Sequence, residues 1–361
     1  MTDGKPVLLH LTTLHPRTDT RIFVKQVQTL ASAFSHQVVL VVADGEGDEE
    51  KGEGILIKDL GKIHGNRISR IIKALWRAFL EIRKIHPQVV HFHDPEIIPL
   101  AVILKIFRYQ VVYDVHENYA LVAYGREWIP WCFRFPLRIF IGFIEKVGGF
   151  FFNAQVAATP SISKRFPESK TIIVQNYPIP SELLLSDSKS FSSRNMSIAY
   201  VGYITTNRGA LEMIRAIGEL DDSKDVSFEF AGAIDSPTLR EELEKASGWG
   251  KVKYHGHVSR NQMANILGNT RAGLVLFHPM ANHIDAQPNK IFEYMAAGLP
   301  VIASDFPLWR EIIDGAKCGL LVDPLSPPSI AEAIRRILSN PKDAHIMGER
   351  GKAAVQETYN W

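Results

Sequence analysis

The chain has 361 residues, of which 46% are hydrophobic and 22% are charged, and its formal net charge is +2. This length suits two domains, the composition is that of a soluble globular protein, and the near-neutral charge gives no reason to expect a nucleic-acid partner. The two cysteines lie far apart, the N-terminus lacks a signal peptide's apolar core, and no apolar run reaches the roughly 20 residues that cross a bilayer, so we expect a cytoplasmic protein.

The first half of the chain alternates short apolar runs with amphipathic helical patterns. The helical patterns include residues 22–34 and 68–85. The runs that we predict to be strands are residues 7–11, 38–43, 89–92, 111–115, 154–158 and 171–174. Strands made mostly of Val, Ile and Leu and separated by helices predict a parallel sheet with helices on both faces.

A polar, serine-rich segment at 181–197 is the predicted linker between a first domain, residues 1–180, and a second domain, residues 198–361. The predicted strands of the second domain are residues 198–201, 226–230, 252–255, 272–277, 300–303 and 319–322. The fold class is therefore α/β, with two doubly wound Rossmann-like domains. Because ligands of open parallel sheets bind beyond the carboxyl ends of the strands, we expect a central cleft where two such edges face each other.

Residues 285–313 hold the most informative motif. Asp285 and Glu293 are eight positions apart, Pro288 and Asn289 mark the start of a helix that contains Glu293, and a short apolar strand follows. Free N–H groups at a helix start suit a diphosphate, and a carboxylate accepts hydrogen bonds from sugar hydroxyls. The stretch resembles the acid-x7-Glu donor motif of GT-B, family 4 glycosyltransferases, above all bacterial surface-polysaccharide members that carry Pro-Asn-Lys-Ile-Phe-Glu-Tyr.

The resemblance implies a GT-B fold and a retaining hexosyltransferase. The donor would be a nucleotide diphosphate sugar, a UDP-sugar in preference to GDP-mannose, and since it is a substrate no cofactor is expected. The acceptor would be a saccharide or polyprenyl-linked saccharide of O-antigen, capsule or another surface polysaccharide. Two alternatives stay open, a GT-B sugar-nucleotide 2-epimerase and a nucleotide-sugar-binding subunit without catalysis. The chain has no Gly-x-Gly-x-x-Gly and no P-loop, which argues against a dehydrogenase or a P-loop NTPase.

The cations that would face the donor diphosphate differ from the family pattern. Gly202 and Tyr203 follow a predicted strand where relatives usually have Gly-Arg, and Arg208 stands near the place of a second base. We expect Lys290 to replace the missing cation, although Arg208 and Lys290 could also be solvated residues at helix starts. No Asp-x-Asp follows an apolar strand, so we expect no metal and assign the departing diphosphate to these two cations and a helix start.

Two acids of the motif have different implied roles. Glu293 matches the acid that holds the ribose hydroxyls in the family, and the neighbouring Asn289 and Ile291 are further donor-binding candidates. Asp285 matches the acid that contacts the donor sugar, a position that is normally Glu, so it could instead be an ordinary loop acid.

Two histidine-bearing segments resemble family segments beside the donor. Gly256 and His257 match the segment next to the nucleotide base, where contacts are mostly made by the backbone, and His257 could equally be a surface residue. His116 and Glu117 end a predicted strand and match the segment whose histidine reaches the donor sugar and pyrophosphate. An imidazole there can donate to developing negative charge, which makes His116 a catalytic candidate.

The acceptor side is expected in the first domain. Arg17 and Arg21 lie in a Pro-Arg-x-Asp-Thr-Arg loop that would suit an anionic acceptor, unless they are ordinary surface arginines, and Glu117 would lie beside them. His93 is predicted to line the acceptor site or to be a satisfied core histidine. His91 and His93 share one face of a strand, but no third ligand has metal-site spacing, so no metal is predicted.

Residues 126–152 interleave aromatic and basic side chains. This pattern is typical either of a segment lying in a membrane interface or of a pair of core helices. An interfacial segment would bring the protein to the inner face of the plasma membrane. Relatives continue from an ending such as residues 359–361 into a helix that crosses back to the first domain, so the resemblance implies a further helix beyond this sequence.

Overall fold

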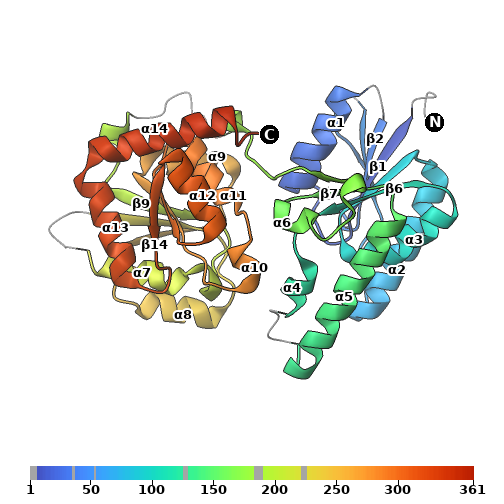
Figure 1. Ribbon diagram of the computed structural model, residues 1–361, viewed down its shortest axis with the longest axis horizontal. Helices are drawn as coiled ribbons and strands as arrows, with labels where there is room; N and C mark the ends of the chain where they lie inside the picture. The colour runs from blue at the N-terminus through green and yellow to red at the C-terminus, as the bar shows by residue number, and fades with distance from the viewer. Residues whose placement is uncertain (1–5, 35–36, 53, 125–128, 183–189, 221–225) are drawn as a thin grey trace. The chain divides into compact units, whose positions relative to one another are not determined.

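The computed structural model describes residues 6–34, 37–52, 54–124, 129–182, 190–220 and 226–361. The chain divides into two compact units, Met1–Asn176 and Tyr177–Trp361. Each unit is a largely parallel sheet with helices on both faces, so the expectation of two Rossmann-like α/β domains is confirmed (Figure 1). The expected linker at 181–197 belongs to the second unit; residues 183–189 of it lie outside the described residues, and β9 begins at Ser197.

The first unit has an eight-stranded sheet in the order β3-β4-β2-β1-β5-β6-β7-β8. Its pairs are parallel except that β3 runs antiparallel to β4. The strands are β1 (Val7–Leu11), β2 (Gln37–Val42), β3 (Glu49–Glu50), β4 (Ile55–Asp59), β5 (Val89–Phe92), β6 (Gln110–Val115), β7 (Ala154–Ala157) and β8 (Thr171–Ile173). The helices are η1 (Thr20–Val27), α1 (Gln28–Ala33), α2 (Arg67–Ile85), η2 (Pro95–Ile97), α3 (Ile98–Ile106), α4 (Tyr119–Tyr124), α5 (Trp131–Phe151), α6 (Pro160–Ser163) and η3 (Glu168–Lys170).

The second unit has a six-stranded, all-parallel sheet in the order β11-β10-β9-β12-β13-β14. The strands are β9 (Ser197–Val201), β10 (Ser227–Ala231), β11 (Val252–Gly256), β12 (Ala272–Val275), β13 (Val301–Ser304) and β14 (Gly319–Val322). The helices are η4 (Pro180–Glu182), η5 (Phe191–Ser193), η6 (Thr206–Arg208), α7 (Ala210–Gly218), α8 (Pro237–Lys245), η7 (Trp249–Lys251), α9 (Arg260–Asn269), α10 (Ala281–Ile284), α11 (Asn289–Ala296), α12 (Pro307–Ala316), α13 (Pro327–Ser339) and α14 (Pro341–Glu357).

The two faces of the first sheet have cores of different character. On one face, side chains of β1, β5 and β6 pack against α2 and α3 in a wholly apolar cluster. On the other face, the apolar cluster of η1, β2 and β4 is small, and beside it lie the buried polar side chains His10, His91 and Asp114. Buried polar groups need partners, because an unpaired one costs about 1–3 kcal/mol, so this second face must hold a hydrogen-bonded network.

The segment η1 supplies that network because it is a π-helix rather than the expected α-helix. The Asp19 carboxylate caps its start by accepting from the Arg21 and Ile22 N–H groups, each at 2.9 Å. A π-helix places residues about five apart on one side. Arg21 and Gln26 therefore both reach the Asp114 carboxylate, while Ile22 and its neighbours pack on β2.

No helix in the described part of the chain combines the length and the mean hydropathy needed to span a membrane.

Candidate functional site

The loop after β9 leaves room for a lysine side chain against the backbone. Gly202 has a φ of 136°, and a Cβ atom added to it would lie 2.5 Å from the Nζ atom of Lys290. The backbone conformation favours glycine at this position. Gly209, with a φ of 71°, opens α7 in the same way, because a Cβ there would lie 2.2 Å from the Leu276 carbonyl oxygen. The chain between these glycines forms the edge beyond β9.

Two cations meet at this edge. The Lys290 Nζ lies 5.2 Å from the centroid of the Tyr200 ring and 5.8 Å from that of Phe277. The Arg208 guanidinium lies 5.4 Å from the Phe277 centroid, and its Nη1 donates to the Tyr203 carbonyl oxygen at 3.3 Å. Within the described residues, neither cation forms an ion pair with a carboxylate.

Lys290 is held in an environment that disfavours its charge. Burial and then the neighbouring Arg208 lower the pKa of Lys290 to about 7, and the more distant Glu293 only partly offsets them. The two aromatic rings supply weak cation–π attraction, about 0.5–2 kcal/mol, which does not replace a carboxylate. Lys290 is also the second residue of α11, where the first N–H groups of the helix have no carbonyl partner within it. An anion bound here would meet two cations and a helix start.

Glu293 lies one turn further along α11 and is not free. Its Oε1 accepts from the Arg260 guanidinium at 2.9 Å, and its side chain is 14% exposed. Arg260 is the first residue of α9, whose start is fixed by a capping box between Ser259 and Gln262. The spacing of acids in the sequence indicated Glu293 but could not indicate Arg260, which comes 33 positions earlier.

Other predicted donor-side residues lie at the same sheet edge without converging as closely. Asp285 is exposed and ends α10, and Tyr203 is 46% exposed and donates its hydroxyl hydrogen bond to Asp235. His257 is exposed, and the preceding Gly256, with a φ of 64°, accepts from the Gly232 N–H at 2.6 Å. The predicted donor-binding roles of these residues therefore stay predictions.

Two further donor-binding candidates lie at the start of α11, and they differ in how far they are exposed. Asn289 is its first residue and is partly exposed. The Ile291 side chain is fully buried in the core, and its N–H donates to the Pro288 carbonyl oxygen at 3.2 Å. A side-chain contact between Ile291 and a donor is therefore ruled out in this conformation.

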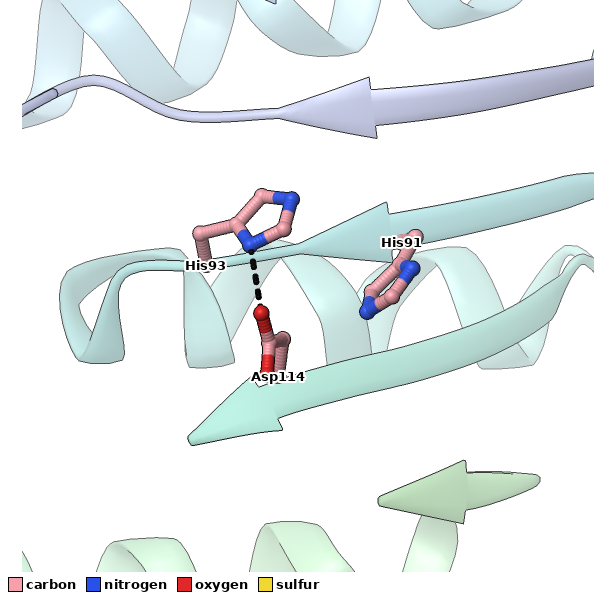
Figure 2. Close-up of side chains that lie close together, drawn as sticks. All are labelled: His91, His93 and Asp114. Atoms are coloured by element: carbon pink, nitrogen blue, oxygen red, sulfur yellow. Dashed lines mark hydrogen bonds and ion pairs between the residues drawn. The ribbon is translucent and has the colours of Figure 1, made fainter. Parts of the chain in front are cut away.

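In the first unit, His10, His93 and Asp114 form a chain of buried hydrogen bonds, and Figure 2 shows the bond between His93 and Asp114. The Nδ1 atom of His10 lies 2.9 Å from Nε2 of His93, whose Nδ1 lies 3.1 Å from Oδ2 of Asp114. If the carboxylate is charged, His93 donates to Asp114 and accepts from His10, which fixes the tautomers of both rings. His93 is thus a satisfied core histidine rather than a residue open to an acceptor.

His91, His93 and Asp114 are close enough together to be considered as metal ligands. Their charges and partners do not fit that role. Arg21 donates to both Asp114 oxygens, at 2.7 and 3.1 Å, and Gln26 donates to Oδ2 at 2.6 Å. A divalent ion would have to displace these bonds and lie beside a buried guanidinium, so we assign His93 and Asp114 to the hydrogen-bonded network, against which the His91 ring packs.

Asp114 is the centre of this network. Burial alone would raise the pKa of its carboxyl group, but the charge of Arg21 and the neighbouring rings outweigh burial and hold the pKa well below its usual range. His116 stacks on His93 with ring centroids 5.4 Å apart, and its Nδ1 lies 3.5 Å from Asp114 Oδ2. Burial lowers the pKa of His116 to about 3, so the ring is neutral at physiological pH. The adjacent Glu117 is exposed.

The two arginines that were expected to bind an anionic acceptor instead form ion pairs with carboxylates of the first unit. Arg17 donates from Nε and Nη2 to the Asp44 carboxylate, at 2.8 and 2.7 Å, and is largely buried. Arg21 pairs with Asp114 and donates to the Val174 carbonyl oxygen at 2.9 Å. Neither guanidinium keeps an unneutralised charge for a ligand, because folding has supplied each with a carboxylate.

Sequence reasoning missed an acidic pair beside this network. Thr13 donates from its backbone N–H to Asp94 and from its hydroxyl group to Glu96, each at 2.6 Å. Burial raises the pKa of Glu96, and its hydrogen bond from Thr13 acts in the opposite direction. Both acids follow β5, so the rule that strand ends carry function could have found them.

Residues 185–354 match the family described as "Glycosyl transferases group 1". An uncharacterized glycosyltransferase of Methanocaldococcus jannaschii is 28% identical over 45% of this chain, a match that spans 41% of that relative. Sucrose-phosphate synthase from Thermosynechococcus elongatus has a TM-score of 0.79 and 16% identity, covering 99% of this chain and 96% of that one. The Anabaena protein HepE in complex with UDP-glucose has a TM-score of 0.72 and 11% identity, covering 98% and 95%.

These matches establish the fold. Residues 185–354, all within the second unit, are similar to group 1 glycosyltransferases, and the chain shares its fold with GT-B glycosyltransferases. The chain spans about two fifths of the length of the curated relative described above. The structural neighbours, at 16% identity or less, speak to the fold alone.

The buried histidines predict an acid-sensitive first unit. Burial lowers the pKa of His91 and His116 to about 3, whereas an unfolded histidine has a pKa of about 6.5. Between these values the unfolded chain binds more protons, so stability falls as the pH drops below about 6.5, by about 2 kcal/mol for each histidine at pH 5. The raised pKa of His15 has the opposite effect on stability, but it comes from one histidine alone.

Thermal unfolding followed at pH 7.5, 6.5, 5.5 and 5.0 measures this effect. We expect the melting temperature to be steady above pH 6.5 and to fall steeply below it, and we expect His91→Gln to make that fall shallower. A melting temperature that does not change between pH 7.5 and 5.0 would contradict neutral buried histidines.

Proposed function

We propose that this protein is a retaining, metal-independent glycosyltransferase that moves a hexose from a nucleotide diphosphate sugar to a saccharide or polyprenyl-linked saccharide of a surface polysaccharide. The observation that carries the proposal is the pair of cations, Lys290 and Arg208, that meet at the start of α11 without a carboxylate partner among the described residues. The group 1 glycosyltransferase domain in the same unit supports it.

The cation pair suits the chemistry of the leaving group. In the transfer, the bond between the anomeric carbon and the diphosphate oxygen breaks, the acceptor hydroxyl oxygen bonds the same carbon, and the hydroxyl proton is lost. Negative charge grows on the departing diphosphate, and preorganised cations stabilise that charge more than they stabilise the bound donor. Lys290, Arg208 and the free N–H groups of α11 together would supply this stabilisation without a metal ion.

Glu293 supports a ribose-bearing donor. A half-buried carboxylate can accept hydrogen bonds from two neighbouring hydroxyl groups, and Arg260 holds it in place from one side. HepE, which shares the fold, is known in complex with UDP-glucose, and this favours a UDP-sugar as the first donor to test. The polysaccharide acceptor is proposed from the Pro-Asn-Lys-Ile-Phe-Glu-Tyr motif at residues 288–294.

The function can be tested by product analysis. The protein is incubated with UDP-glucose, UDP-galactose, UDP-N-acetylglucosamine or GDP-mannose, with and without a polyprenyl-linked sugar, in EDTA. We expect release of nucleoside diphosphate that depends on the acceptor and persists in EDTA, with a glycosidic product of retained anomeric configuration. Interconversion of donors without an acceptor would identify a 2-epimerase instead, and activity that is lost in EDTA and restored by Mg²⁺ would overturn metal independence.

Glu293→Ala is expected to weaken donor binding by at least about 100-fold, because two hydrogen bonds to a charged acceptor, each about 1.5–3 kcal/mol, are lost. Isothermal titration with the donor that gives product measures this change. Glu311→Ala, an exposed acid on α12, is the matched control and should bind as the wild type does. A folded Glu293→Ala protein that binds within twofold of the wild type would remove Glu293 from the site.

Lys290→Ala is expected to lower kcat by about 100-fold while changing donor affinity less, because the lysine acts mainly on charge that develops during bond cleavage. Steady-state kinetics separates the two effects. Lys290→Arg should recover part of the loss, and Lys253→Ala, an exposed lysine on β11, should have no effect. A near-normal kcat with only a raised KM would mean that Lys290 serves ground-state binding alone.

Donor binding is also expected to depend on pH through Lys290. Because its pKa in the free protein is about 7, binding of a diphosphate above that pH must first protonate the amine. The dissociation constant for a UDP-sugar should therefore rise by up to tenfold per pH unit between pH 7.5 and 9 and stay level below pH 7. Titrations in buffers of different ionisation enthalpy should show proton uptake, and Lys290→Arg should abolish both effects. A dissociation constant that stays level from pH 7 to 9 would contradict this account.

A further inference from the structure

The outer side of α5 is apolar, which is the reverse of the usual arrangement on a soluble domain. Its exposed side chains include Phe135, Ile139, Phe140 and Phe143, the last being 63% exposed. The one acidic residue of the helix, Glu145, is buried, where it accepts from the Tyr113 hydroxyl at 3.2 Å and pairs with Arg165. Residues 131–151 of this aromatic and basic segment thus form one helix with an exposed apolar side and a side that packs on the unit. Residues 126–128 lie outside the described residues.

A second exposed apolar stripe lies on α2. Ile68, Ile72, Trp76 and Leu80 follow one another at intervals of four residues, and all four are exposed, Trp76 by 61%. Residues four apart lie on one side of an α-helix, so these side chains form a continuous ridge. The opposite side of α2 is the one that packs against the sheet, through Ala74, Ala78 and Ile82.

The two helices belong to one layer. Buried residues of α2 and α3 share an apolar core with β1, β5 and β6. Phe79 of α2 contacts Phe107 at the end of α3, with ring centroids 5.8 Å apart, and Ile98 of α3 lies against Gly148 of α5 (Figure 1). Their outer sides therefore form one surface, which we call the apolar helical face: the exposed side chains of α2, of α5 and of Ile106 and Phe107 between them.

The charges around this face are almost all positive. Within its bounds, α2 carries six basic residues and one acidic residue, and α5 carries three basic residues and one acidic residue, the buried Glu145. The whole chain has a net charge of only +2, so the basic residues are concentrated here. Two copies of such a face would repel each other, and none of the described helices can span a bilayer.

We propose that the apolar helical face docks on the surface of an anionic lipid bilayer. The Phe and Ile side chains of α5 and the α2 ridge enter the boundary between headgroups and acyl chains, and the flanking Arg and Lys side chains contact the anionic headgroups. The proposal does not rest on sugar transfer, because it concerns the first unit alone and can be measured without nucleotide or acceptor. It would place the first unit where a lipid-linked acceptor resides.

Sedimentation with vesicles tests the docking directly. The full chain is mixed with phosphatidylcholine vesicles that contain 0 or 30% phosphatidylglycerol, at 50 and 500 mM salt. We expect binding to the anionic vesicles at low salt, weaker binding at high salt and little binding to pure phosphatidylcholine, since each basic side chain near an anionic surface strengthens binding roughly fivefold. Absence of binding to every vesicle at both salt concentrations would overturn the proposal.

Variants locate the contact. Phe140→Glu with Phe143→Glu should weaken binding by more than tenfold, and Trp76→Ser should weaken it by roughly tenfold, because each removes a large apolar side chain from the bilayer boundary. Ile346→Glu, at an exposed position on α14 in the second unit, is the matched control and should bind as the wild type does. Equal melting temperatures would show that the variants fold.

Three results would count against the face as assigned. Wild-type binding by the Phe140→Glu, Phe143→Glu protein would overturn the proposal, and wild-type binding by Trp76→Ser would overturn the inclusion of α2. Concentration-dependent dimers that the double variant abolishes, with no lipid binding, would assign the face to a second copy of the chain. Failure of any of these tests leaves donor binding by the second unit unaffected, so the two proposals fail separately.

Discussion

The ammonium group of Lys290 lies near two aromatic rings and a guanidinium, and no carboxylate in the described part of the chain forms an ion pair with it. Without a bound ligand this arrangement destabilises the charged form of Lys290, because neighbouring cations repel and burial disfavours charge. Gly202, whose backbone conformation favours glycine, lies beside the amine, and α11 begins one residue before Lys290. A half-buried cation pair that has no carboxylate partner among the described residues is readily explained by an anionic ligand, and the match of residues 185–354 to group 1 glycosyltransferases suggests which class of ligand to test.

In the first unit, by contrast, the buried charges are paired with each other. Arg21 and Asp114 form a close pair, and Gln26 and His93 complete the hydrogen bonds of the carboxylate. Removing one member of such a buried pair costs about 3–5 kcal/mol, which makes the network a structural requirement. Its open side is His116, a neutral ring without a hydrogen bond of normal length, and this residue keeps its candidate role in catalysis. Paired charges thus hold the first unit together, and the cations without a described carboxylate partner are the ligand site that we propose for the second.

Local pattern was enough to predict the alternation of strands and helices, because buried parallel strands read as short apolar runs. It missed β4, whose sequence Ile-Leu-Ile-Lys-Asp lies close to acidic residues, and it predicted an α-helix where η1 is a π-helix. The motif led to Glu293 and Lys290. It could not lead to Arg260 or to the partners of Arg21, because such contacts join residues far apart in the chain. The composition of α5 fitted either a core helix or an interfacial helix, and the exposure of Phe140 and Phe143 opposite the buried Glu145 supports the proposal of an interfacial one.

The central claim is that the second unit binds a diphosphate through unpaired cations. Its most direct test is the melting temperature of the chain with saturating UDP, UMP or uridine. A ligand at 100 times its dissociation constant stabilises the folded state by about 2.7 kcal/mol, which corresponds to a shift of roughly 5–11 °C for a unit of this size. The account predicts such a shift with UDP, a smaller one with UMP and none with uridine. Equal shifts with UDP and uridine, or no shift with UDP or GDP, would contradict it.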